Sequence, residues 1–163
     1  MITMKELRRI LTTRKSEKGQ SLVELAISLP VLLLILLGVV DFGMAIFSYA
    51  ILRDAAQEGA LYGSFNPGNE AEIENRTRNI LPENDDVLYS SPVELRDTSK
   101  VEVEIDVIGA ACQGVTSGPA NSIRVNVRYQ YNITMPIIGV VIGTDTIPLT
   151  GTATNVILQP PCP

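Results

Sequence analysis

The chain has 163 residues, a formal net charge of −5 and no histidine. An acidic balance argues against nucleic acid as a partner, because a phosphate-binding surface needs clustered Lys and Arg. Without histidine the chain lacks the commonest general base and every Ser-His-Asp or Cys-His arrangement, and it has no glycine-rich phosphate loop. We therefore expect no enzyme activity and no cofactor, and the two cysteines match no zinc pattern, so we expect no metal site.

The first segment, residues 1–19, is basic. It carries six Lys and Arg against two acidic residues, whereas the rest of the chain has seven basic and sixteen acidic residues. Basic flanks of a membrane helix stay in the cytoplasm, so we expect a cytoplasmic N-terminus and an acidic domain on the other side. The segment has no convincing core-facing periodicity, and we expect at most a short amphipathic turn there.

An apolar stretch follows from Gly19 to Leu52. Its part from Leu25 to Val40 has no charged residue and spans about 24 Å as a helix, close to the ~30 Å hydrocarbon core of a bilayer. A secretory signal also starts basic and then apolar, but its apolar core is only about 7–15 residues long and ends at a small-residue cleavage site. The run here is longer and ends at no such site, so we predict one membrane-spanning helix.

Glu24 lies at the start of this run. A charged side chain at the bilayer centre costs about 3 kcal/mol on insertion scales, and less near the interface, so Glu24 needs a partner. If a protease cut after Gly19, the new α-amino group of Gln20 could pair with Glu24 of a neighbouring chain. Alternatively, the anchor stays uncleaved and the Glu24 side chain extends to the interface.

At Lys18–Glu24, KGQSLVE, the chain resembles the type IV prepilins. The longer strings KGQSLVELAISLPVLLLILLGVVDFGMAIF and RDAAQEGALYG are similar to the TadE-like pseudopilins of tight-adherence (Tad) pilus systems. This resemblance implies that a prepilin peptidase cuts after Gly19 and that Glu24 is the fifth residue of the mature chain. Gln20 would be the first, where type IV pilins usually have Phe or Met. It also implies other pilin or pseudopilin subunits and the Tad assembly machinery as partners.

Two residues interrupt the apolar helix. Pro30 removes one backbone hydrogen bond, and we expect a bend there. Asp41 either marks the outer boundary between membrane and water or contacts a partner helix within an assembly. We leave both possibilities open.

Beyond Asp41 the helix should continue to Gly63. Small side chains line one face and allow another backbone to approach closely, either the sheet of the same chain or a neighbouring subunit. Three charged residues on the helix should face solvent. The small residues are Ala55, Ala56, Gly59, Ala60 and Gly63, and the charged ones are Arg53, Asp54 and Glu58.

A second, short helix is predicted at 70–81, ended by Pro82. The acidic run at 82–86 lacks the pattern of a calcium loop, and we interpret it as a solvated turn. The apolar segment 135–143 is too short to span a membrane as a helix. It could be a covered loop or strand, or an apolar patch used in assembly.

Alternating residues predict strands at 101–107 and 123–133. If the two pair as a hairpin, Glu102 faces Arg128 and Asp106 faces Arg124, with the apolar side chains on the helix-facing side. A last strand around 146–158 should complete the sheet. Its expected inward residues are Ile147, Leu149, Ala153 and Ile157.

The two cysteines, Cys112 and Cys162, both follow the membrane helix. In an oxidising compartment a disulfide between them would stabilise the folded chain by a few kcal/mol. Two unpaired thiols remain the alternative.

These observations predict an α+β, pilin-like fold in which a long N-terminal membrane-spanning helix packs on a small antiparallel sheet. The resemblance implies that residues 1–19 form a leader removed by the peptidase, and we expect 20–63 to form the membrane and extended helix and 64–163 an extracytoplasmic head. The resemblance implies a pseudopilin or minor pilin for pilus assembly, adhesion or secretion, held in the cell membrane and then in an extracellular pilus. The alternative is an uncleaved single-pass protein whose acidic ectodomain binds a ligand or scaffolds a secretion complex.

Overall fold

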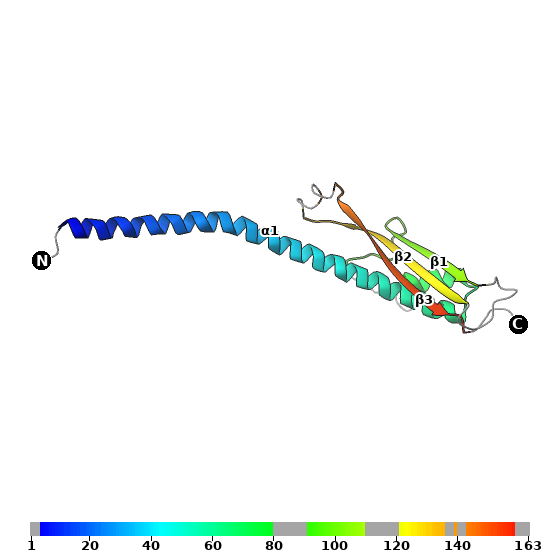
Figure 1. The fold of residues 1–163 in the computed structure, drawn as a ribbon. Helices are drawn as coiled ribbons and strands as arrows, with labels where there is room; N and C mark the ends of the chain where they lie inside the picture. The colour runs from blue at the N-terminus through cyan, green and yellow to red at the C-terminus, as the bar shows by residue number, and fades with distance from the viewer. Residues whose placement is uncertain (1–3, 80–90, 110–120, 136–138, 140–142, 159–163) are drawn as a thin grey trace. The chain divides into compact units, whose positions relative to one another are not determined.

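The computed structural model describes residues 4–79, 91–109, 121–135, 139 and 143–158, with side chains described from residue 19 onward. The chain divides into two compact units, Met1–Val40 and Asp41–Pro163. The predicted α+β fold, a long N-terminal helix with a small antiparallel sheet, is confirmed (Figure 1). The elements in order are α1 (Met4–Phe65), α2 (Glu70–Thr77), β1 (Val101–Ile108), β2 (Ser122–Asn132) and β3 (Thr146–Val156).

Helix α1 is longer than predicted at both ends. It begins at Met4, so the expectation of only a short turn in the basic segment was wrong. Lys, Arg, Glu and Leu predominate there and are strong helix formers, which favours a helix even without a face to bury. The helix continues through Pro30 and ends at Phe65, two residues beyond Gly63.

In the first unit all described residues belong to α1, and the apolar side chains described there are largely exposed. From Leu22 to Val40, thirteen large hydrophobic side chains each expose between 49% and 68% of their surface. The segment from Gly19 to Phe65 is the one helix among the described residues that is long and apolar enough to cross a membrane. In water this surface would be unfavourable, whereas in a bilayer it meets an apolar solvent.

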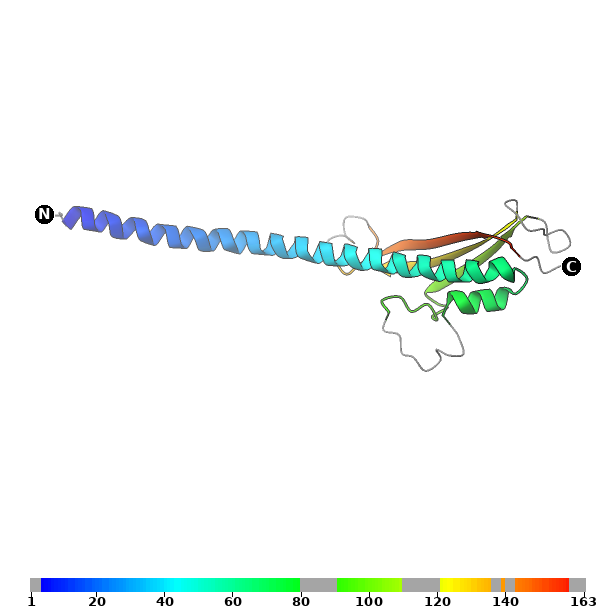
Figure 2. The same ribbon diagram turned by 90° about the horizontal axis from the view of Figure 1, so that it is seen from below.

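In the second unit, α1 and α2 pack on one face of the sheet. Buried residues of both helices and of the strands form one core, which includes Leu52, Ala56, Ile73, Ile123 and Val127. Figure 2 shows α2 beside the C-terminal part of α1. The small residues of α1 thus pack within the same chain, as one of the two readings expected, and the predicted solvent-facing residues Arg53, Asp54 and Glu58 are exposed.

Two of the glycines lie directly against other elements of this core. A Cβ added at Gly63 would lie 2.5 Å from Cδ1 of Ile123. A Cβ at Gly151 would lie 2.5 Å from the carbonyl oxygen of Leu52 and from the amide nitrogen of Arg53, so β3 crosses the backbone of α1 at this point. No side chain fits between the two elements there.

Helix α2 begins at an Asn cap and ends at a buried arginine. The Asn69 side chain accepts a hydrogen bond from the amide of Glu72, which satisfies one free N–H of the first turn. Arg78 is 5% exposed and donates to the carbonyls of Leu95 and Val101. It therefore joins the end of α2 to the start of β1. The predicted helix at 70–81 ends at Thr77, and Pro82 and the acidic run at 82–86 lie outside the described residues.

The sheet is antiparallel in the order β1-β2-β3. Glu102 pairs with Arg128 and Asp106 with Arg124, which confirms the predicted register. On the face away from the helices, Arg128 contacts Glu104 at 2.8 Å and Glu102 at 3.7 Å. Of the inward residues expected in β3, Leu149 and Ala153 are half-buried and Ile147 is 37% exposed, while Ile157 is fully buried just past the strand.

Candidate processing and assembly site

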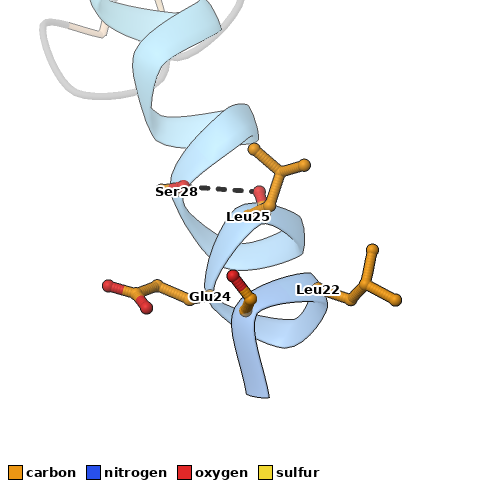
Figure 3. Close-up of a pocket in the computed structure, with 5 residues that line it drawn as sticks. Leu22, Glu24, Leu25 and Ser28 are labelled. Carbon is orange, nitrogen blue, oxygen red and sulfur yellow. Dashed lines mark hydrogen bonds between the residues drawn. The ribbon is translucent and has the colours of Figure 1, made fainter. Parts of the chain in front are cut away.

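The predicted site residues Gly19, Gln20 and Glu24 all lie on α1 in the first unit, and all three are exposed. Residues around Glu24 border an open hollow on the helix surface, where Leu22 and Glu24 extend on opposite sides of the helix (Figure 3). The hydroxyl of Ser28 donates to the carbonyl of Leu25 over 3.4 Å, which satisfies that hydroxyl locally. The carboxylate of Glu24 has no hydrogen bond or ion pair with any side chain that the structure describes.

Gly19 has no packing reason to be glycine in this structure. A Cβ at Gly19 would meet no atom within 4 Å, unlike one at Gly63. Glycine inside a helix costs about 1 kcal/mol relative to alanine. Among the other glycines of α1, Gly43 is equally open, and it offers a matched control for experiments on Gly19.

A second carboxylate, Asp41, has a full set of partners. Its side chain accepts hydrogen bonds from the hydroxyl of Tyr131 at 2.8 Å, from the amide of Thr134 at 3.2 Å and from the amide of Met135 at 3.3 Å. Only 7% of Asp41 is exposed. Asp41 therefore links α1 through hydrogen bonds to the end of β2 and to the segment that follows it. Neither sequence interpretation of Asp41 predicted this role.

Tyr131 donates to Asp41 through its side chain, whereas Thr134 and Met135 donate through their backbone amides. Burial, together with the hydrogen bond to Asp41 and its negative charge, raises the pKa of Tyr131 from 10.0 to about 12. The phenol consequently stays neutral and able to donate throughout the physiological range. The signal that could have revealed it is the parity of the strand, since Tyr131 belongs to the same inward-facing set as Val125 and Val127.

Cys112 and Cys162 lie outside the described residues, as does most of the apolar segment 135–143. Among the residues that the structure describes, no group of three or more His, Cys, Asp or Glu side chains could hold a metal ion. The geometry of the described part thus centres on an exposed carboxylate in an apolar helix and a second, buried carboxylate that joins this helix to the head.

A family model described as TadE-like protein matches residues 19–61. No curated protein and no solved structure matches the chain. The expected resemblance to TadE-like proteins is thereby confirmed over residues 19–61, which include most of the apolar helix. Among the described residues, the long apolar helix suggests an association with a membrane.

Proposed function

We propose that the chain is a pseudopilin or minor pilin subunit that is assembled into a Tad-type pilus or secretion apparatus. Residues 1–19 act as a basic cytoplasmic leader, 20–63 as the membrane and extended helix, and 64–163 as the extracytoplasmic head. A prepilin peptidase removes the leader between Gly19 and Gln20. The bilayer stores the subunit until the assembly machinery extracts it.

The observation that carries this proposal is the exposure of Glu24 within the otherwise apolar stretch of α1 from Leu22 to Val40. The chain supplies Asp41 with three donors, yet the described side chains supply Glu24 with none. A carboxylate at membrane depth without a partner is costly, so a partner from outside the chain is favoured.

The α-amino group released by cleavage is such a partner. It would lie four residues before Glu24, about 6 Å along the helix axis. Two copies displaced along the axis by that amount would bring the amine of one beside the carboxylate of the other. An ion pair in an apolar medium is much stronger than in water, so it would fix the stagger between neighbouring subunits.

Intact mass of the protein purified from membranes tests the proposal, with and without a prepilin peptidase in the same cells. We expect loss of residues 1–19 only when the peptidase is present. A full-length chain in both preparations would instead support an uncleaved single-pass protein with an acidic ectodomain that binds a ligand or scaffolds a secretion complex.

A further inference from the structure

In the part of α1 that begins at Asp41, small and polar side chains face the rest of the second unit and large apolar side chains face outward. Asp41, Ala45 and Ser48 face the rest of the second unit and are buried or half-buried. The large apolar side chains point outward instead. They are Phe42, Met44, Ile46, Phe47 and Tyr49, which expose between 43% and 69% of their surface.

This arrangement is the reverse of an amphipathic helix in water, which buries its large apolar face. Its inward polar groups have partners: Asp41 has its three donors, and the hydroxyl of Ser48 donates to the carbonyl of Met44 over 2.9 Å. A helix with satisfied polar groups inside and large apolar groups outside suits an apolar solvent.

Within one turn after Tyr49, the outward face of α1 changes from apolar to charged and the inward face becomes apolar. Arg53 is the first charged residue of α1 after Asp41, and it is exposed, as are Asp54 and Glu58. On the inward side, Leu52 and the small residues that follow it are buried. From Asp41 to Arg53 the helix rises about 18 Å, so the outward apolar surface extends well past the first carboxylate.

We infer that the outward surface of Phe42–Tyr49 contacts lipid at the extracytoplasmic interface of the membrane, and that the boundary between membrane and water lies near Arg53 rather than at Asp41. Three observations point to lipid as the occupant. The surface follows directly on the exposed apolar run of Leu22–Val40 in the same helix, and it stops where charged residues begin. It also contains Tyr49, a residue type enriched at membrane interfaces. The hydrogen-bonded Asp41 can lie at interfacial depth because its donors replace water.

This inference rests on the membrane anchoring in the proposed function but not on cleavage or assembly. The natural chain contains no tryptophan, so a single introduced tryptophan reports its own surroundings. The variants are Phe47→Trp and Phe42→Trp. The matched control is Phe65→Trp, an exposed Phe on the same helix beyond the charged residues. The full chain is reconstituted in phosphatidylcholine vesicles, purified by flotation and titrated with brominated phosphatidylcholine or with acrylamide.

We expect both test variants to fluoresce at shorter wavelength than the control and to be quenched several-fold more by the brominated lipid. The control should be quenched mainly by acrylamide. Equal acrylamide quenching of Phe47→Trp and Phe65→Trp would overturn the inference and leave the anchor intact. Shielding from both quenchers that increases with the protein-to-lipid ratio would show that a second copy covers the surface, which also overturns it. Failure of the chain to float with the vesicles would overturn the anchoring itself.

Discussion

The hydroxyl of Tyr131 donates to the carboxylate of Asp41 over 2.8 Å, although 90 residues separate the two in sequence. The amides of Thr134 and Met135 complete the contact. One acidic side chain of α1 thereby accepts hydrogen bonds from three donors at the end of β2 and just after it, which links the helix to the sheet.

Replacing Asp41 by alanine should destabilise the head. The substitution leaves the Tyr131 hydroxyl and two amides without their acceptor, and we expect a loss of about 1.5–3 kcal/mol in the free energy of unfolding. Urea unfolding of the full chain in detergent measures it. Asp54→Ala, an exposed carboxylate on the same helix, should change stability by less than about 0.5 kcal/mol. Equal effects of the two substitutions would show that the Asp41 contact contributes nothing.

The same contact predicts a loss of stability in alkali. The pKa of Tyr131 is raised to about 12 in the folded state, so its contribution is fully present below pH 10 and is lost as the pH rises through 12. Tyr131→Phe should be less stable than the natural chain near neutral pH, and its stability should decline less between pH 10 and 12. Tyrosinate absorbance should show one late-titrating phenol that the variant lacks. An unchanged titration curve would contradict this assignment.

Gly151 should tolerate no side chain. The Cβ of Gly151→Ala would lie 2.5 Å from two backbone atoms of α1, and a backbone cannot rotate away as a side chain can. We expect a loss of about 1–3 kcal/mol or more in thermal or urea unfolding. Gly43→Ala, where the added methyl meets nothing, should be neutral or slightly stabilising.

The proposed cleavage predicts different outcomes for two open helical glycines. Alanine fits equally well at Gly19 and at Gly43, so both variants should fold and insert like the natural chain. We expect Gly19→Ala to accumulate as the full-length chain in cells that contain the peptidase, whereas Gly43→Ala is processed normally. The intact mass of each variant purified from membranes shows whether residues 1–19 have been removed. Normal processing of Gly19→Ala would remove the cleavage site from this position.

The proposed assembly contact predicts a specific defect for Glu24→Ala. The chain should still insert in the membrane, because removal of a charge from an apolar helix makes insertion easier. Filament yield should fall, since the amine of the neighbouring Gln20 loses its partner. Asp54→Ala is the control with an unaltered yield. Unchanged filaments from Glu24→Ala would count against the ion pair.

The register of the sheet was predictable because two independent patterns agree. Alternation placed the apolar residues of β1 and β2 on one side, and opposite charges on the other side selected the pairing of Glu102 with Arg128. A slip by one residue would have exposed the buried Val125 and Val127. Local sequence therefore contained enough information to fix this part of the fold.

The partners of Asp41 were not predictable in the same way. Two of its three donors are backbone amides, which every residue other than proline possesses, so no residue type identifies them. Both sequence interpretations assigned Asp41 to surroundings outside the chain, either water at the membrane boundary or a partner helix, whereas a later segment of the same chain supplies its hydrogen-bond donors. Gly151 was missed for a related reason: it shares the inward parity of Leu149 and Ala153, but without a side chain it has no apolar signal.

The part of α1 from Asp41 to Ser64 is joined to the sheet region by hydrogen bonds at both of its ends. Asp41 holds one end, and near the other the carbonyl of Ser64 accepts a hydrogen bond from the amide of Leu158, just past β3. A subunit pulled by its helix would transmit force into the sheet at two places about 35 Å apart. The force would then act as shear along the strands instead of separating them one hydrogen bond at a time, which would suit the proposed subunit because it must leave the membrane without unfolding.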